Sequence, residues 1–122
     1  MDDKPNIEQL VIAWLTNAVG NDWPVFGDKP KDAPEAFILV DRTGGPREAM
    51  VLDRAEILIE VYHKKSRLKA SNRASAIADV IVGLEAYDHN ITHADVNSLV
   101  NLDDTQGQYH RYQIYCDVYH RR

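Results

Sequence analysis

The spacing of hydrophobic residues predicts an amphipathic helix near the start of the chain. Between residues 7 and 19, apolar side chains recur every three or four positions, with polar side chains on the opposite side. Asn6 is suited to cap the first turn, and Gly20 is suited to end the helix. Residues 21–35 follow as a long connection with three prolines. We expect apolar side chains to anchor this connection across a sheet or against a neighbouring chain: Trp23, Val25 and Phe26.

Two pairs of strands are predicted from runs of branched and aromatic residues. Residues 35–43 and 55–63 form the first pair, and in 55–63 apolar and polar side chains alternate, as in a strand with one buried face. Residues 44–54 are expected to form a wide loop between these strands. Residues 95–104 and 109–122 form the second pair, joined by a turn at residues 105–108.

A second helix is predicted between the strand pairs, beginning at Ser66 or Ser71 and ending at Tyr87. Its buried side consists of aliphatic residues at helical spacing: Ala74, Ile77, Ala78, Ile81 and Leu84. The order of elements is therefore α-β-β-α-β-β. This order favours an α+β fold, a single domain over residues 1–122 in which an antiparallel sheet of about four strands carries both helices on one face.

The composition is that of an ordinary globular domain. The chain has 122 residues, of which 44% are hydrophobic and 27% charged, and its formal net charge is −5. One core fits this length, and the acidic balance argues against a protein that coats nucleic acid. Cys116 is the single cysteine, so no internal disulfide is expected. The polar N-terminus and the short apolar runs predict a soluble protein without a signal peptide or membrane segment.

The glycine pair Gly44-Gly45 raises the question of a phosphate-binding loop. Such a loop continues with Lys-Ser/Thr and opens a helix, whereas here Pro46-Arg47 follows and the sequence stays extended. We therefore interpret the pair as a turn and expect no nucleotide or other cofactor.

Metal and nucleophile chemistry have weak sequence support. His89 and His93 are four residues apart with Asp95 close behind, which suits a metal only on a helix, and this segment is expected to be a loop entering a strand. Cys116 alternates with Ile114 and Val118 and is expected to point into the core. We expect no metal site and no enzymatic activity.

The start of the second helix is unusually basic. Lys64, Lys65, Arg67 and Lys69 lie where positive charge opposes the helix macrodipole. Two interpretations stay open: a solvated basic end, or an electrostatic contact with an acidic surface of a neighbouring subunit.

The last strand presents two different faces. One face carries apolar side chains such as Ile114 and Val118, and the other mixes aromatic and polar side chains. Together with Leu58 and Tyr62 of the preceding strand pair, this second face is enriched in residues that protein interfaces favour. Its members on the last strand are Arg111, Gln113, Tyr115, Asp117 and Tyr119.

Several stretches resemble one protein family. They are a strand ending in Val-x-Arg-x-Gly-Gly, here Val40 to Gly45, an Asp-led strand at Asp53, a helix with an alanine-rich face, and a closing Arg111-Tyr112-Gln113 strand. Taken in this order, the stretches span nearly the whole chain. On these stretches the sequence resembles the tail terminator (tail completion) proteins of long-tailed bacteriophages. The order of elements carries most of the resemblance.

The resemblance implies an architectural role. Copies would form a ring, typically a hexamer, that caps the tail tube, stops its growth and presents a surface to the head-completion proteins. DNA would pass through the lumen without sequence-specific binding, and the protein would assemble in the host cytoplasm and reside in the tail or neck of the virion. The expected subunit or tail-tube contacts are Arg42, Gly44, Gly45, Arg47, Leu58, Tyr62, Arg111, Tyr115 and Tyr119.

Two other classes of protein remain as alternatives. A small ferredoxin-like ligand-binding or regulatory domain would require a pocket with convergent polar groups between sheet and helices, which the sequence does not indicate. A toxin or nuclease would require a basic groove with a histidine or carboxylate set.

Overall fold

The computed structural model describes residues 6–19, 22–44, 52–106 and 108–121. Helix α1 (Ile7–Val19) is followed by the short strand β1 (Val25–Phe26) and by strands β2 (Ala36–Gly44) and β3 (Leu52–His63). Helix α2 (Arg67–Val80) continues through a 3₁₀ turn, η1 (Ile81–Gly83), into the short helix α3 (Leu84–Tyr87). Strands β4 (Ile91–Asn101) and β5 (His110–Arg121) complete the described chain.

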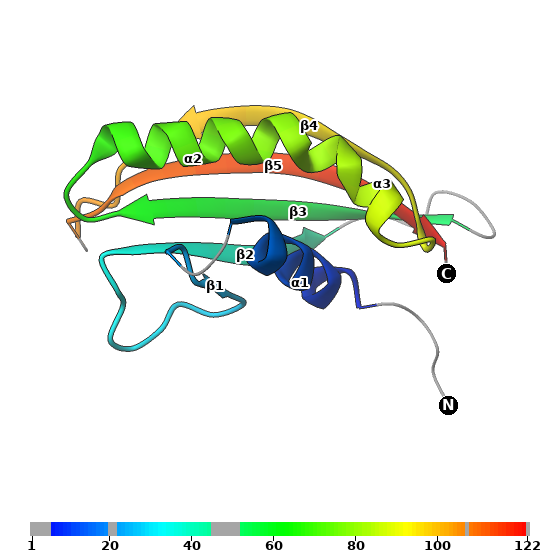
Figure 1. Ribbon diagram of the computed structural model, residues 1–122, viewed down its shortest axis with the longest axis horizontal. Coiled ribbons are helices and arrows are strands. Elements are labelled where there is room, and N and C mark those ends of the chain that lie inside the picture. Colours follow the sequence, from blue (N-terminus) through cyan, green and yellow to red (C-terminus); the bar gives the residue numbers. More distant parts are fainter. Residues whose placement is uncertain (1–5, 20–21, 45–51, 107, 122) are drawn as a thin grey trace.

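The strands form one sheet in the order β1-β2-β3-β5-β4 (Figure 1). The pairs β2–β3, β3–β5 and β4–β5 are antiparallel, and β1 runs parallel to β2. The α+β class is confirmed, whereas the expected four-stranded antiparallel sheet is a five-stranded mixed sheet. The additional strand lies in the proline-containing connection, where Val25 pairs with Ile38 and Phe26 with Leu39. Two residues are too few to show an alternating pattern, so this strand could not be predicted from the sequence.

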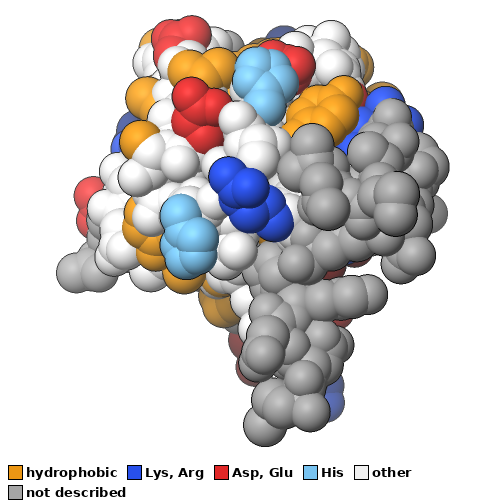
Figure 2. Space-filling model, turned by 90° about the vertical axis from the view of Figure 1, so that its right-hand side faces the viewer, with side chains coloured by type: hydrophobic (Ala, Val, Ile, Leu, Met, Phe, Trp, Pro, Cys, Tyr) orange, Lys and Arg blue, Asp and Glu red, His pale blue; other side chains and the backbone are white. Residues whose placement is uncertain are grey.

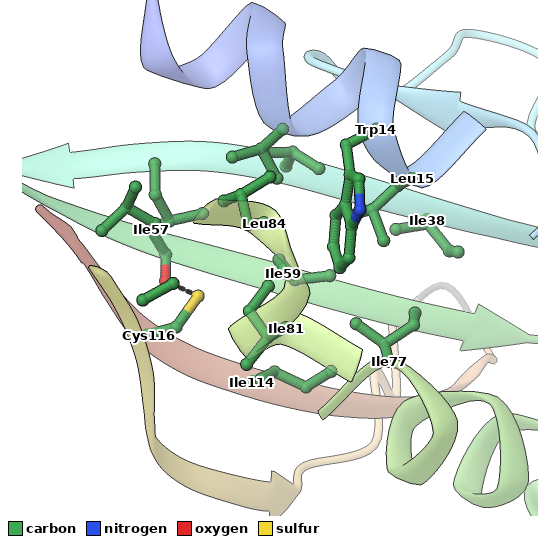
Figure 3. Close-up of a cluster of buried hydrophobic side chains, with 14 of the residues drawn as sticks. Trp14, Leu15, Ile38, Ile57, Ile59, Ile77, Ile81, Leu84, Ile114 and Cys116 are labelled. Atoms are coloured by element: carbon green, nitrogen blue, oxygen red, sulfur yellow. Dashed lines mark hydrogen bonds between the residues drawn. The ribbon is translucent and has the colours of Figure 1, made fainter. Parts of the chain in front are cut away.

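Both helices cover the same face of the sheet, as the sequence predicts. Figure 3 shows Trp14 and Leu15 of α1 meeting Ile77 of α2 and Ile81 of η1 above the side chains of the strands. The sheet contributes a row of buried aliphatic residues to this core: Ile38, Val40, Ile57, Ile59, Val61, Ile114 and Val118. Packing of two amphipathic helices on one dry face is what holds the domain together.

Asn6 caps the first helix as predicted, and the second helix starts at one of its two predicted positions, whereas the predicted stop at Gly20 lies outside the described residues. The side chain of Asn6 accepts a hydrogen bond from the backbone N–H of Gln9 at 3.0 Å. Ser66, one of the two predicted starts of the second helix, caps α2 by accepting from the N–H of Lys69 at 3.1 Å. Each bond satisfies an N–H group that the first helical turn leaves without an intrahelical partner.

The second helix is not continuous to Tyr87, because it tightens into η1 at Ile81–Gly83. In a 3₁₀ turn, side chains three residues apart lie in line, so Ile81 and Leu84 both point at the sheet. Both are fully buried, as the predicted stripe requires, whereas Ala78 is only half-buried.

Strand boundaries differ from the prediction where bulges interrupt the alternation. Strand β4 begins at Ile91, before the predicted start at residue 95, and its register shifts between Ile91 and His93 and again between Val96 and Ser98. Each extra residue moves the following side chains to the opposite face, which hides the period of two from the sequence. The predicted turn at residues 105–108 is closed by two backbone hydrogen bonds between Asp104 and Tyr109, of 2.9 and 3.0 Å.

The connection before β2 crosses the sheet edge and contacts both faces. Trp23 packs into the helix-side core, as predicted for an anchoring residue. Phe26 packs on the opposite face against a second, smaller cluster formed by Phe37, Leu39, Tyr62 and Tyr109. The second face of the sheet is thus divided into a part covered by the connection and an open part along β3, β5 and β4.

Candidate functional site

The open part of the second face, called the open face below, is centred on Tyr115 of β5. Tyr115 lies opposite Leu58 of β3 and opposite Ser98 of β4, and it is 39% exposed. Leu58 is half-buried beside it. Tyr119, another predicted contact residue, lies further along β5 on this face and is half-buried near the ring of His93, at 6.0 Å between centroids. The structure therefore pairs Leu58 with Tyr115 and places Tyr119 further along the same face, as the alternation of β5 predicts.

Tyr62 was expected on the same exposed surface, but it is only 3% exposed. Its ring stacks on Phe37 at 4.5 Å between centroids and meets Tyr109 edge-on at 5.7 Å. Burial raises the pKa of the Tyr62 hydroxyl, and the Glu60 carboxylate adds to this effect. The Tyr62 ring therefore does not belong to the exposed surface on which it was expected, because the connection before β2 and Tyr109 cover it within the monomer.

Arg111 is engaged within the chain. Its Nε donates a hydrogen bond to the carbonyl oxygen of Leu102 at 2.8 Å, and its Nη1 donates to the Tyr62 hydroxyl at 3.4 Å. The same Nη1 lies 3.6 Å from a carboxylate oxygen of Glu60. These contacts fix the guanidinium at the border between the covered and open parts of the face.

A chain of side-chain hydrogen bonds continues from Glu60 across the open face. Gln113 donates to the Glu60 carboxylate at 2.9 Å, and the Tyr115 hydroxyl donates to the Gln113 side-chain oxygen at 3.3 Å. Glu60, Gln113 and the Tyr115 hydroxyl are thus hydrogen-bonded to one another, so these three groups keep their partners when another chain covers them.

Three carboxylates form a row across the same face. The strand register places Asp117 directly opposite both Glu56 on β3 and Asp95 on β4. Each acid has a compensating neighbour: Arg54 lies 3.7 Å from Glu56, Asn97 donates to Asp117 at 2.9 Å, and His93 lies 2.9 Å from Asp95. We call these three carboxylates the acidic row. Like charges directly opposite each other in a sheet repel, so the row lowers the folding stability of the monomer.

The predicted contacts at the end of β2 lie elsewhere. Arg42 is exposed, and its backbone N–H donates to the Glu8 carboxylate of α1 at 2.9 Å, which places it beside the helices. Gly44 ends β2 and is half-buried. Gly45 and Arg47 lie outside the described residues. The structure does not bring Arg42 together with Tyr115, because Arg42 is paired with Ile57, whose side chain lies on the helix-covered face.

The basic segment at the start of α2 is largely paired within the chain. Lys65 lies 3.2 Å from the Glu35 carboxylate, and Arg67 lies 3.1 Å from the Asp103 carboxylate. Lys64 is exposed near the Tyr109 ring, at 6.0 Å. Two of the four basic side chains thus form ion pairs inside the monomer, which reduces the electrostatic cost of cations at this helix end.

Asp103 links the start of α2 to the hairpin of β4 and β5. Besides Arg67, it accepts hydrogen bonds from the Asn101 side chain at 3.1 Å and from the Arg111 backbone N–H at 3.3 Å. Burial alone would raise the pKa of this carboxyl, but these hydrogen bonds and the Arg67 charge outweigh it and hold the pKa below its usual value.

A polar cavity of about 550 Å³ lies between α2 and the connection before β2. Its lining includes Trp23, Glu35, His63, Lys69 and Arg73. The rings of Trp23 and His63 are 5.7 Å apart, and the Arg73 guanidinium lies 5.5 Å from the Trp23 ring centroid. The sequence did not indicate a pocket with convergent polar groups, because its residues come from three separate segments.

His63 is the buried titratable group of this cavity, at 4% exposure. Its Nδ1 accepts hydrogen bonds from the backbone N–H groups of Lys65 and Ser66, at 3.1 and 3.0 Å. Burial lowers the pKa of His63, although the nearby Glu35 carboxylate opposes this. The His63 ring is therefore held in its neutral form, and its two hydrogen bonds fix the turn from β3 into α2.

Cys116 lies in the core, as predicted, and is 2% exposed. Its Sγ donates to the carbonyl oxygen of Ile57 at 3.4 Å (Figure 3). Burial, followed by the charge of Asp117, raises the pKa of this thiol to about 12. A thiol with this pKa is not a nucleophile at neutral pH.

Other chemistry is sparse in the described part of the chain. Among residues 6–19, 22–44, 52–106 and 108–121, no cluster of three or more His, Cys, Asp or Glu side chains is arranged to hold a metal ion. None of the described helices has the length and apolar character needed to cross a bilayer. At the end of the molecule where β3 begins and β5 ends, Figure 2 shows acidic, basic, histidine and hydrophobic side chains interspersed.

Comparisons with known proteins leave the family open. No family model matches the chain, and no curated protein matches it.

Proposed function

We propose that the protein is a tail terminator of a long-tailed bacteriophage. Copies form a closed ring, expected to be a hexamer, that caps the tail tube, stops its polymerisation and offers a surface to the head-completion proteins. The observation that carries this proposal is the open face, where Tyr115 is 39% exposed beside Leu58 although both helices cover only the other face. Aromatic side chains of this kind are enriched where protein surfaces meet.

The acidic balance of the chain, with a formal net charge of −5, is compatible with DNA passing through the lumen of such a ring without being bound. The protein would act in the tail or neck of the virion after assembly in the host cytoplasm.

The test compares assembly with folding in two matched double variants. Leu58→Asp with Tyr115→Ala alters the open face, and Leu68→Asp with Tyr87→Ala makes the same changes at exposed positions on the helix side, where Leu68 is 69% and Tyr87 45% exposed. Native mass spectrometry, with and without tail-tube protein from the same phage, measures ring formation. Electron micrographs of complemented lysates measure tail length.

We expect rings and normal tails from the wild type and the helix-side variant. The open-face variant should give monomers, overlong tubes and heads without tails. A wild type that forms nothing larger than a dimer under either condition would contradict the ring, and an open-face variant that caps tails normally would contradict the assigned surface.

A second candidate function is favoured by the polar cavity. A small α+β domain that binds a charged ligand requires a hollow with convergent polar groups, and the residues around His63 provide one. Ligand binding by a protein that never assembles with tail tubes would favour this function over the ring.

A further inference from the structure

His63 presents one fixed hydrogen-bond donor to the polar cavity. Because Nδ1 accepts from two backbone N–H groups, it carries no hydrogen, and in the neutral ring the hydrogen is on Nε2. The Oε2 atom of the Glu35 carboxylate is 3.9 Å from Nε2, which exceeds hydrogen-bond distance. Within the described part of the chain, this donor at a 4% exposed side chain has no hydrogen-bond acceptor.

Two cations of α2 line the same cavity one helical turn apart. Lys69 and Arg73 are separated by four residues, so they lie on one side of the helix. Among the described residues, neither side chain has a carboxylate within ion-pair distance, and the Arg73 guanidinium rests over the Trp23 ring at 5.5 Å. In contrast, Lys65 and Arg67 on the preceding turn both have carboxylate partners.

From this juxtaposition we propose that the cavity binds a small ligand through an oxyanion, a carboxylate or a phosphate. The oxyanion accepts from Nε2 of His63 and is neutralised by Lys69 and Arg73, with the side-chain amide of Asn72 on the same wall. Charge-assisted hydrogen bonds of this type are stronger than those between neutral groups. The cavity volume of about 550 Å³ is within the usual range for small-molecule sites.

The opposite wall limits what the ligand can be. Asp22 and Glu35 also line the cavity, and Glu35 is held by Lys65 at 3.2 Å. A ligand with negative charge at both ends would be repelled by this wall. The site therefore suits a molecule with a single oxyanion and a neutral or positively charged remainder. The proposal goes beyond the ring and does not depend on it.

The experiment titrates the full-length protein with sodium phosphate and, separately, with sodium acetate, at constant ionic strength maintained with sodium chloride. The imidazole nitrogens of His63 and the indole N–H of Trp23 are followed by NMR, which reports on the cavity directly. The phosphate and acetate series distinguish the two kinds of oxyanion, since the preferred ligand class gives the lower Kd.

Three variants and a control locate the site. Lys69→Gln with Arg73→Gln removes both cations, and His63→Asn removes the Nε2 donor while its side-chain oxygen can still accept from the turn. Lys64→Gln is the control, because it removes a cation from the same basic segment but does not line the cavity. Glu35→Gln removes a competing carboxylate.

We expect saturable shifts of His63 and Trp23 with at least one of the two anions. The Kd should rise by about tenfold or more in the Lys69/Arg73 variant and in His63→Asn, stay within about twofold in Lys64→Gln, and fall in Glu35→Gln. The proposal is overturned if neither anion gives a saturable shift, or if the Lys69/Arg73 variant binds as tightly as Lys64→Gln. Amide spectra of each variant verify that it is folded.

Discussion

The hydroxyl of Tyr109 donates a hydrogen bond to the carbonyl oxygen of Pro34, 2.9 Å away and 75 positions earlier in the chain. This bond joins the turn between β4 and β5 to the connection before β2. The Tyr109 ring at the same time packs edge-on against Phe37 and Tyr62. One side chain thus closes the second, smaller core.

Substitution of Tyr109 should separate these two contributions. Tyr109→Phe removes the hydrogen bond and should lower the free energy of unfolding by about 1 kcal/mol. Tyr109→Ala also removes the ring and should cost about 3–5 kcal/mol. Urea denaturation followed by circular dichroism measures both values. Equal losses for the two variants would show that the ring contributes nothing to the second core.

Two neighbouring residues of β5 should differ in how much folding stability is lost when their side chains are truncated. Ile114 is fully buried, and Ile114→Ala should cost about 2–5 kcal/mol of folding stability. Tyr115, on the open face, is its matched control, and Tyr115→Ala should change stability by less than about 1 kcal/mol in the monomer. Thermal melting measures both. If Tyr115→Ala destabilised the monomer as much as Ile114→Ala, the open face would be part of the monomer's core.

The pH dependence of stability should report on His63. Its folded-state pKa is lowered from the ordinary value of 6.5, mainly by burial, so the unfolded chain binds the proton more tightly. The stabilising effect of a neutral His63 is complete above pH 6.5 and is lost as the pH falls through the folded-state pKa. The charged and titratable groups around it are Glu35, Lys65, Lys69 and His110.

The comparison is between wild type and His63→Asn, whose free energies of unfolding are measured by urea titration between about pH 5 and 7. The wild type should lose stability towards the acidic end, and the variant should lose less. Parallel curves would show that His63 titrates alike in the folded and unfolded chain. His63→Ala, which cannot accept from Lys65 and Ser66, should be less stable than His63→Asn at every pH.

Cys116 should be chemically inert in the folded protein. With the thiol pKa at about 12 and the side chain 2% exposed, reaction with a thiol reagent at pH 8 requires unfolding. The labelling rate should therefore increase with urea in proportion to the unfolded fraction. Fast, complete labelling without denaturant would contradict the core position.

The acidic row should destabilise the monomer in a salt-dependent way. Asp117→Asn removes the central charge between Glu56 and Asp95 and should raise stability by up to about 1 kcal/mol at low salt. The gain should shrink as salt screens the repulsion. A loss of stability at every salt concentration would show that the hydrogen bond from Asn97 outweighs the repulsion.

The strongly periodic elements could be predicted from the sequence because one face of each is buried in the main core. This holds for α1, for the alternation of β3, and for the alternation of β5 that separates Ile114 from Tyr115. The cap at Ser66 also follows from local chemistry, since its hydroxyl reaches the third N–H of its own helix. Each of these features depends on residues close together in the chain.

Features that depend on long-range contacts could not be predicted. Strand β1 exists because Val25 and Phe26 meet the edge of β2, and burial of Tyr62 depends on Tyr109 and the connection. The pairing of Arg67 with Asp103 joins residues 36 positions apart, so the basic segment looked unpaired in the sequence. The cavity around His63 was missed for the same reason.

The two edges of the sheet are very unequal. On one side the sheet ends in β1, which is two residues long, and on the other in β4, which is eleven residues long. Outward-facing amide and carbonyl groups therefore run along the eleven residues of β4, so among the described strands β4 offers the longer edge strand for pairing with another chain. The sheet is consequently asymmetric in its own plane: a further strand would meet a long edge strand at β4 and a two-residue edge strand at β1.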